Sequence, residues 1–172
     1  MSEVNYAPVG ATGVGDAVWV GAPVGFRGFE GTVRVGEGEQ VWGAAAEAVM
    51  RWGVKTRSGF GVEGAEVAVV GEDCVLVVGV GPVRVREPVR VVEVVETGDR
   101  CGFAYGTRVG HPVVGEEAFV VHRGRDGVVW LTIRSVTRAG RGWWRVVFPA
   151  VLVAQRVYRR RYLRAFEGLG VG

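Results

Sequence analysis

Apolar and polar residues alternate along much of this chain, in short segments separated by turn residues. Because successive side chains of a strand point to opposite faces, a period of two predicts β-strands. Connections as short as Asp126-Gly127 favour antiparallel hairpins and a meander. Pro88 is expected to break or bulge the strand that contains it. We expect strands near residues 17–20, 26–35, 66–70, 74–80, 83–96, 101–107, 116–123 and 128–137.

The period becomes helical in two places. Residues 39–52 have an alanine-rich centre and apolar residues at helical spacing, and Gly53 is expected to end this helix. A second amphipathic helix is predicted over 143–167, with Gly168 as its stop. Pro149 lies in its first turns, where it either begins the helix proper or kinks it. The apolar stripe of this helix consists of Val147, Val151, Ala154, Tyr158, Tyr162 and Ala165.

The order of these elements indicates the fold class. A strand and a helix are followed by a long antiparallel meander and a terminal amphipathic helix. This order is typical of an α+β helix-grip fold, in which a curved sheet of about six to seven strands wraps around a long C-terminal helix, with one shorter helix. We expect residues 1–172 to form a single domain of this kind, with an irregular segment at 1–25 that is rich in Gly and Pro.

Composition agrees with a β-rich chain and narrows the classes of partner. Valine accounts for 40 of the 172 residues, and β-branched side chains favour sheets. Lys55 is the single lysine among 21 basic residues, a bias that a GC-rich genome would produce. The net charge of +3 is modest and no nucleic-acid-binding motif is present, so specific nucleic-acid binding is not expected.

Cysteine usage and the start of the chain indicate the cellular setting. Cys74 and Cys101 lie in neither a CxxC pair nor a Cys/His cluster, so we expect reduced structural thiols, no metal site and no cofactor. The first residues lack a basic and then apolar leader, and no uncharged apolar stretch is long enough to span a membrane. A soluble cytoplasmic protein without a transmembrane segment is expected. Nothing in the sequence indicates an oligomeric state.

Polar residues gather in one block, residues 102–121, of an otherwise apolar sheet sequence. Alternation places Tyr105 and Thr107 on one face of a strand and separates Glu116 from Glu117 on the next, so at most one carboxylate points into a cavity. Together with His111 in the connection, these residues form a polar rim for a ligand or acid–base groups that act on it. The alternative is structural: the connection satisfies backbone groups, and the paired glutamates face solvent.

Two further features concern the terminal helix. Aromatic residues near its expected contact with the sheet, including Trp130 and Tyr158, either pack in the core or line a pocket for a hydrophobic molecule. On its opposite face, Arg156, Arg160 and Arg164 recur every four residues. Such a stripe is typical of a solvated face that compensates the helix dipole, and the alternative is contact with an anionic surface.

The polar block resembles a known family. The matching residues are Phe103-Ala104-Tyr105-Gly106-Thr107, Gly110-His111-Pro112 and Gly115-Glu116-Glu117. Looser agreement includes Tyr6, Gln155 and Tyr162-Leu163-Arg164-Ala165. The chain is similar to the uncharacterised bacterial and plant family catalogued as domain of unknown function 1990. Val113 stands where that family usually has an acid, and Thr137-Arg138-Ala139 stands where it usually has Ser-Arg-Pro.

The resemblance implies a fold and a class of ligand. It implies a member of the helix-grip superfamily of START and birch-pollen-allergen proteins, which commonly hold an apolar ligand between the sheet and the terminal helix. It implies no general activity.

Three functions from different classes are therefore open. The first is binding of an apolar or amphipathic small molecule between sheet and terminal helix. The second is a metal-independent cyclase, lyase or hydrolase in which His111 acts with Glu116 or Glu117. The third is an interaction protein that binds anionic surfaces through its arginine-rich helix. The candidate ligand-binding residues are Tyr105, Thr107, His111, Glu116, Glu117, Trp130 and Tyr158.

Overall fold

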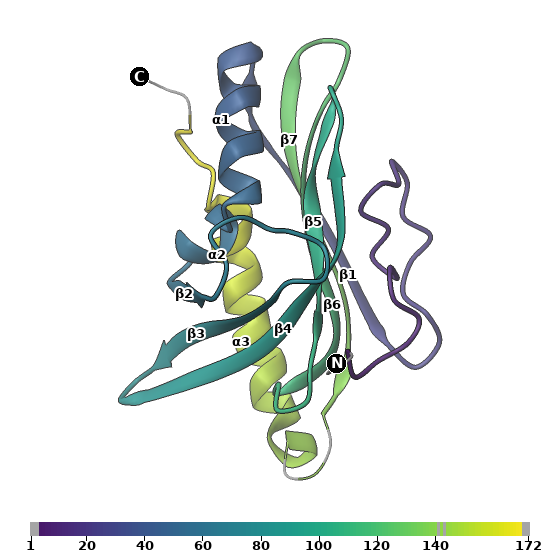
Figure 1. The fold of residues 1–172 in the computed structure, drawn as a ribbon, viewed down its shortest axis with the longest axis vertical. Helices are drawn as coiled ribbons and strands as arrows, with labels where there is room; N and C mark the ends of the chain where they lie inside the picture. The colour runs from purple at the N-terminus through teal and green to yellow at the C-terminus, as the bar shows by residue number, and fades with distance from the viewer. Residues whose placement is uncertain (1–3, 141, 143, 170–172) are drawn as a thin grey trace.

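The computed structural model of the chain describes residues 4–140, 142 and 144–169 (Figure 1). Within these residues, seven strands form one sheet in the order β1-β7-β6-β5-β4-β3-β2, and every neighbouring pair is antiparallel. Strands β2 to β7 form a meander, and β1 pairs with β7 at one edge. The strands are β1 (Arg27–Glu37), β2 (Phe60–Glu63), β3 (Asp73–Val80), β4 (Val83–Glu96), β5 (Arg100–Thr107), β6 (Val113–Arg123) and β7 (Val128–Ala139).

Three helices, α1 (Glu39–Met50), α2 (Gly53–Thr56) and α3 (Trp144–Arg164), lie on one side of this sheet in Figure 1. The main core lies between the helices and the sheet, and its fully buried side chains include Trp52, Phe103, Phe119 and Phe166. The apolar stripe expected for the terminal helix faces inward, as predicted. None of the described helices combines the length and apolar character needed to cross a membrane.

The irregular N-terminal segment covers the other side of the sheet (Figure 1). Val14 of this segment packs with Ala104, Ala118 and Val120 in a second, smaller apolar cluster. The buried Arg134 guanidinium of β7 donates to the carbonyl oxygen of Gly13 at 2.6 Å. The sheet is therefore covered on both faces, by helices on one and by irregular chain on the other.

Two of the predicted strands are wrong. Residues 17–20 and 66–70 contain no strand, whereas β2 forms at Phe60–Glu63. Val18 and Val20 are 79% and 99% exposed, so their apolar alternation faces no core. In the second segment, the Ala68 N–H donates to the carbonyl oxygen of Met50 at 2.8 Å, so this backbone bonds to the end of α1 and not to a strand.

The end of the first helix also differs from the prediction. α1 stops at Met50, and Gly53 begins α2 instead of ending α1. Between them Trp52 adopts a left-handed conformation with φ 60°, which its packing against Phe103 at a ring distance of 4.6 Å helps to hold. A Cβ at Gly53 would lie 2.4 Å from the Ala48 carbonyl oxygen. Glycine is therefore needed for this tight turn, which directs α2 toward the sheet.

Pro88 and Pro149, the two prolines for which the sequence predicted a break, bulge or kink, both lie inside regular elements. Pro88 does not break β4, and the irregularity of that strand lies between Val91 and Glu93. The Pro88 carbonyl accepts a hydrogen bond from the Arg108 N–H, just beyond the end of β5. N–H and C=O groups of one strand residue point to the same side, so the missing Pro88 N–H would also face Arg108, beyond the end of β5, and costs no bond of the β3–β4 ladder. Pro149 lies inside a continuous α3.

Replacing Gly53 by Ala is predicted to destabilise the protein by about 1–3 kcal/mol, because the added methyl group would collide with backbone. The matched control is Gly43→Ala in α1, where the added Cβ has no atom within 4 Å apart from its chain neighbours and the backbone of its own helix. That change is predicted to stabilise the protein by about 0.5–1 kcal/mol through helix propensity. Urea unfolding of both variants tests the pair, and equal effects would contradict the assigned α1–α2 geometry.

Candidate functional site

A cavity of about 310 Å³ lies between α3 and the sheet. This volume is at the lower end of the range of small-molecule sites in proteins. Its walls are mainly apolar, with Val147, Val151 and Ala154 of α3 facing Val78 and Val85 of strands β3 and β4. The apolar stripe of α3 therefore lines a cavity at this point and does not pack directly against the sheet.

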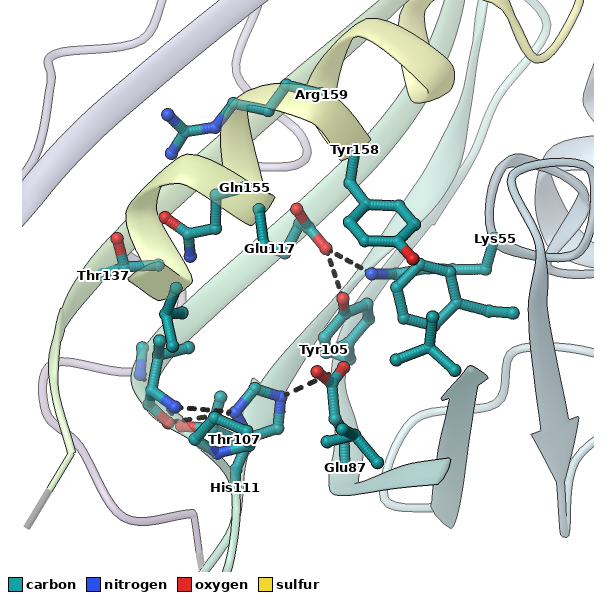
Figure 2. A pocket seen from close by; sticks show the side chains of 18 of the residues that line it. Lys55, Glu87, Tyr105, Thr107, His111, Glu117, Thr137, Gln155, Tyr158 and Arg159 are labelled. Atoms are coloured by element: carbon teal, nitrogen blue, oxygen red, sulfur yellow. Dashed lines mark hydrogen bonds and ion pairs between the residues drawn. The ribbon is translucent and has the colours of Figure 1, made fainter. Parts of the chain in front are cut away.

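The cavity contains a buried ion pair. Lys55 of α2 and Glu117 of β6 approach to 2.8 Å, with side-chain exposures of 3% and 18% (Figure 2). Tyr105 lies directly opposite Glu117 in the β5–β6 register and donates its hydroxyl hydrogen to the same carboxylate oxygen. The Lys55 ammonium also donates to the Tyr162 hydroxyl at 2.7 Å. Side chains of α2 and β5 thus meet at the Glu117 carboxylate of β6, and Lys55 links this group to Tyr162 of α3.

Aromatic rings complete the surroundings of the Lys55 ammonium. Its nitrogen lies 4.3 Å from the Phe60 ring centre and 4.6 Å from that of Tyr162, within the range of cation–π attraction. An unpaired buried ammonium would cost several kcal/mol, so the carboxylate and the rings are what permit Lys55 at this depth. Burial, and then the Glu117 charge, raise the pKa of both Tyr105 and Tyr162. Both phenols therefore stay protonated hydrogen-bond donors.

A second pair of titratable groups lines the same cavity. His111 Nε2, from the β5–β6 connection, lies 3.7 Å from Glu87 Oε2 of β4. Burial raises the pKa of the Glu87 carboxyl to about 7, an effect that the Lys55 charge opposes and the Glu117 charge reinforces. Burial, and then the Lys55 charge, lower the pKa of His111 to about 3. Near neutral pH an uncharged imidazole therefore faces a carboxyl group that readily gains or loses a proton.

Glu116 lies on the other face of the sheet from Glu117, as alternation predicts. It borders the cavity, but its carboxylate accepts hydrogen bonds from the N-terminal segment: from the Tyr6 hydroxyl at 2.5 Å, the Gly10 N–H at 2.8 Å and the Thr12 N–H at 2.9 Å. Burial, and then the Glu116 charge, raise the pKa of Tyr6 and keep it a donor. Glu116 therefore anchors the N-terminal segment, while its role as a ligand contact stays a prediction.

The other predicted residues occupy different positions. Thr107 borders the cavity, but its hydroxyl donates to Asn5 Oδ1 at 2.6 Å and accepts from the Gly115 N–H at 2.9 Å. Tyr158 lines the cavity and packs on Phe60 with a ring distance of 4.9 Å. Trp130 is not part of the cavity lining. Its β7 neighbours Val129 and Leu131 are in the main core, so alternation turns Trp130 to the opposite face, and its prediction as a cavity residue is wrong.

Lys55 and Glu87 were not predicted as site residues. Lys55 carried a usable signal, because it is the single lysine in a chain where every other basic residue is arginine. Lysine offers a compact ammonium where arginine offers a planar guanidinium, so this exception distinguishes position 55 from the other basic positions. Glu87 carried no comparable signal, since an acid next to proline in a long strand resembles an ordinary solvated residue. The pairing of β4 with β5 brings Glu87 beside the connection that holds His111, and this pairing cannot be read from the residues around Glu87.

The arginine stripe of α3 lies outside the cavity. Arg156, Arg160 and Arg164 are exposed, and Arg164 pairs with Glu167 at 3.0 Å. Binding of an anionic surface by this stripe stays a prediction.

Comparison with known sequences shows the family. The family model described as "Domain of unknown function (DUF1990)" matches residues 5–165. The chain is also 36% identical over 144 residues to the "UPF0548 protein" of Deinococcus radiodurans, a match that covers 77% of this chain and 72% of the relative.

Comparison with solved structures shows the fold. A hypothetical protein from Helicobacter pylori has a TM-score of 0.60 at 9% identity, covering 96% of this chain and 95% of its own. Ara h 8.0201 has a TM-score of 0.54 at 10% identity, covering 84% and 97%. A point mutant of Thalictrum norcoclaurine synthase, in complex with a transition-state analogue, has a TM-score of 0.53 at 7% identity, covering 82% and 94%. The chain has the helix-grip fold that these comparisons support, and it belongs to the DUF1990 family.

Proposed function

We propose that this protein binds an amphipathic small molecule in the cavity between α3 and the sheet. One observation carries the proposal: apolar walls enclose a space that has buried, precisely paired polar groups at one end. Ligand sites in proteins combine a mainly apolar lining with a few oriented polar groups in this way. A core that served stability alone would gain nothing from a buried lysine, because apolar residues of similar volume are often equally stable.

The two parts of the site suit two parts of a ligand. The apolar residues of α3, β3 and β4 contact its hydrocarbon portion, whose removal from water supplies most of the affinity. The hydroxyls of Tyr105 and Tyr162 and the carboxyl groups of Glu87 and Glu117 surround its polar end. The cavity volume of about 310 Å³ sets the scale of the ligand.

The structural neighbours support the capacity of the fold for this role. Norcoclaurine synthase, which shares the fold at 7% identity, was solved with a transition-state analogue. A helix-grip domain can therefore hold a small molecule and support catalysis. The low identity gives no reason to transfer that substrate or reaction.

Filling the cavity from α3 is predicted to abolish binding. Val151→Trp places an indole in the space, whereas the control Val153→Trp adds the same ring on the exposed face of the same helix, where Val153 is 59% exposed. Fluorescence titration with N-phenyl-1-naphthylamine, a neutral hydrophobic probe, measures the binding. The probe is predicted to bind at least about tenfold more weakly to Val151→Trp than to wild type, and with little change to Val153→Trp. Equal affinity in both variants would place the bound probe elsewhere.

Acid–base catalysis in the same cavity is the second candidate, and the Glu87 carboxyl favours it. A group with a pKa of about 7 can both give and take a proton near neutral pH. His111, with its pKa of about 3, is uncharged there and is a poor acid–base partner. We infer that an enzyme built on this cavity would use Glu87, next to Glu117 and Lys55, as its acid–base group, in place of the pairing of His111 with Glu116 or Glu117 considered from the sequence.

The raised pKa of Glu87 predicts a specific pH dependence of stability. The folded protein binds this proton more tightly than the unfolded chain, so wild-type stability falls, relative to Glu87→Gln, as pH rises from about 4.5 to about 7. The free energy of unfolding of the variant minus that of wild type is predicted to increase by on the order of 3 kcal/mol across this window. Urea unfolding at a series of pH values measures the difference.

Glu63→Gln provides a control of opposite sign. A hydrogen bond from Arg86 lowers the pKa of the Glu63 carboxyl, so its contribution to stability is lost as pH falls. The difference between this variant and wild type is therefore expected to change only at acidic pH and in the reverse direction. A difference for Glu87→Gln that stays constant from pH 4.5 to 7.5 would show that this carboxyl titrates normally.

A further inference from the structure

Two buried polar groups of the cavity have no hydrogen-bond partner among the residues that the structure describes. They are the Thr137 hydroxyl oxygen of β7 and the Gln155 side-chain oxygen of α3. Figure 2 shows both side chains on the side of the cavity away from Lys55 and Tyr105. Leaving such a group unpaired costs about 1–3 kcal/mol, so a pair of them in one place calls for an explanation.

Other polar side chains of the cavity have partners within the protein. Glu117 is bound by Lys55 and Tyr105, and the hydroxyl of Thr107 both donates and accepts a hydrogen bond. Arg159 lines the cavity, but its guanidinium donates to the Ser135 hydroxyl at 3.1 Å. Among the fully buried side-chain atoms of the cavity lining that the structure describes, those without a partner belong to Thr137 and Gln155, and both groups are uncharged.

Local structure does not account for either residue. Thr137 lies opposite Gly115 of β6, which has no side chain, and opposite Arg27 of β1, yet no described group bonds to its hydroxyl. Valine would occupy the same volume and leave nothing unpaired. Gln155 lies on the inner face of α3 beside Ala154 and Tyr158, where an apolar side chain would suit the cavity wall equally well. Both side chains line the cavity that a ligand would fill.

We propose that Thr137 and Gln155 form a neutral hydrogen-bonding subsite, and that the ligand of this cavity has a second, uncharged polar group, such as a hydroxyl, carbonyl or amide, which they recognise. The inference rests on the proposed function and narrows its ligand class from amphipathic molecules with one polar end to molecules that are polar at two separated points. The hydroxyl and the amide can each donate and accept, which suits any of these groups.

Matched pairs of simple probes test the subsite. The n-alkanols of six to ten carbons carry one hydroxyl, and the α,ω-alkanediols of the same lengths carry two. Each is titrated against bound N-phenyl-1-naphthylamine in wild type and in the Thr137→Val/Gln155→Met variant. In wild type, the diol of the best-fitting length is predicted to bind about tenfold more tightly than its alkanol. In the variant this preference is predicted to reverse, with the alkanol at least as tightly bound as before.

The outcomes separate the two proposals. If no alkanol or diol displaces the probe from wild type, the proposed binding function fails. If alkanols bind but no diol is preferred, or if the preference survives in the variant, binding stands and the subsite is overturned.

Stability gives an independent readout that needs no ligand. Thr137→Val removes an unmatched hydroxyl, so its urea midpoint is predicted to equal or exceed that of wild type. Thr107→Val removes a matched hydroxyl and is predicted to lower the midpoint. A comparable loss of stability in both variants would mean that the Thr137 hydroxyl is bonded within the protein, and the subsite would be rejected.

Discussion

Two adjacent carboxylates of β6 lie inside the protein on opposite faces of one sheet, and each requires its own partners. A buried carboxylate is tolerated only where charges or hydrogen-bond donors compensate its lost hydration. Glu116 obtains its donors from the N-terminal segment, which is thereby held against the outer face. Glu117 obtains Lys55 and Tyr105, which ties α2 to the inner face. The same strand thus organises the cover of one face and the polar end of the cavity on the other.

The chemistry of the cavity follows from the depth of that ion pair. Lys55 occupies its position because Glu117 and the aromatic rings replace water around its ammonium. Its charge reaches the neighbouring pair, where it opposes the rise in the pKa of Glu87 and reinforces the fall in the pKa of His111. Polar chemistry therefore gathers at one end, while the valines of α3, β3 and β4 keep the remainder apolar. This division is what suits the cavity to an amphipathic molecule.

Sequence patterns predicted the parts of the fold that local periodicity controls. The strands from β3 to β7, the inward stripe of α3 and the separation of Glu116 from Glu117 all depend on side-chain periods of 2 or 3.6 residues. The false strand at 17–20 shows one limit, because alternation indicates a strand only where a core exists to bury one face. The false strand at 66–70 shows another, because Ala68 is buried in the main core but its backbone bonds to the end of α1. Trp130 was misplaced although alternation with Leu131 would have turned it outward. Partners brought together by the fold, such as Tyr6 with Glu116 or Lys55 with Glu117, leave no local pattern.

The single lysine offers the most direct test of the account. Incorporating ¹³C-labelled lysine gives one side-chain NMR signal, that of Lys55, at the polar end of the cavity. Titration with decan-1-ol is predicted to shift this signal saturably, with the same apparent affinity that displacement of N-phenyl-1-naphthylamine reports. A Lys55 signal that stays unchanged while decan-1-ol displaces the fluorescent probe would show that the ligand binds away from the Lys55–Glu117 pair, and would contradict the central claim.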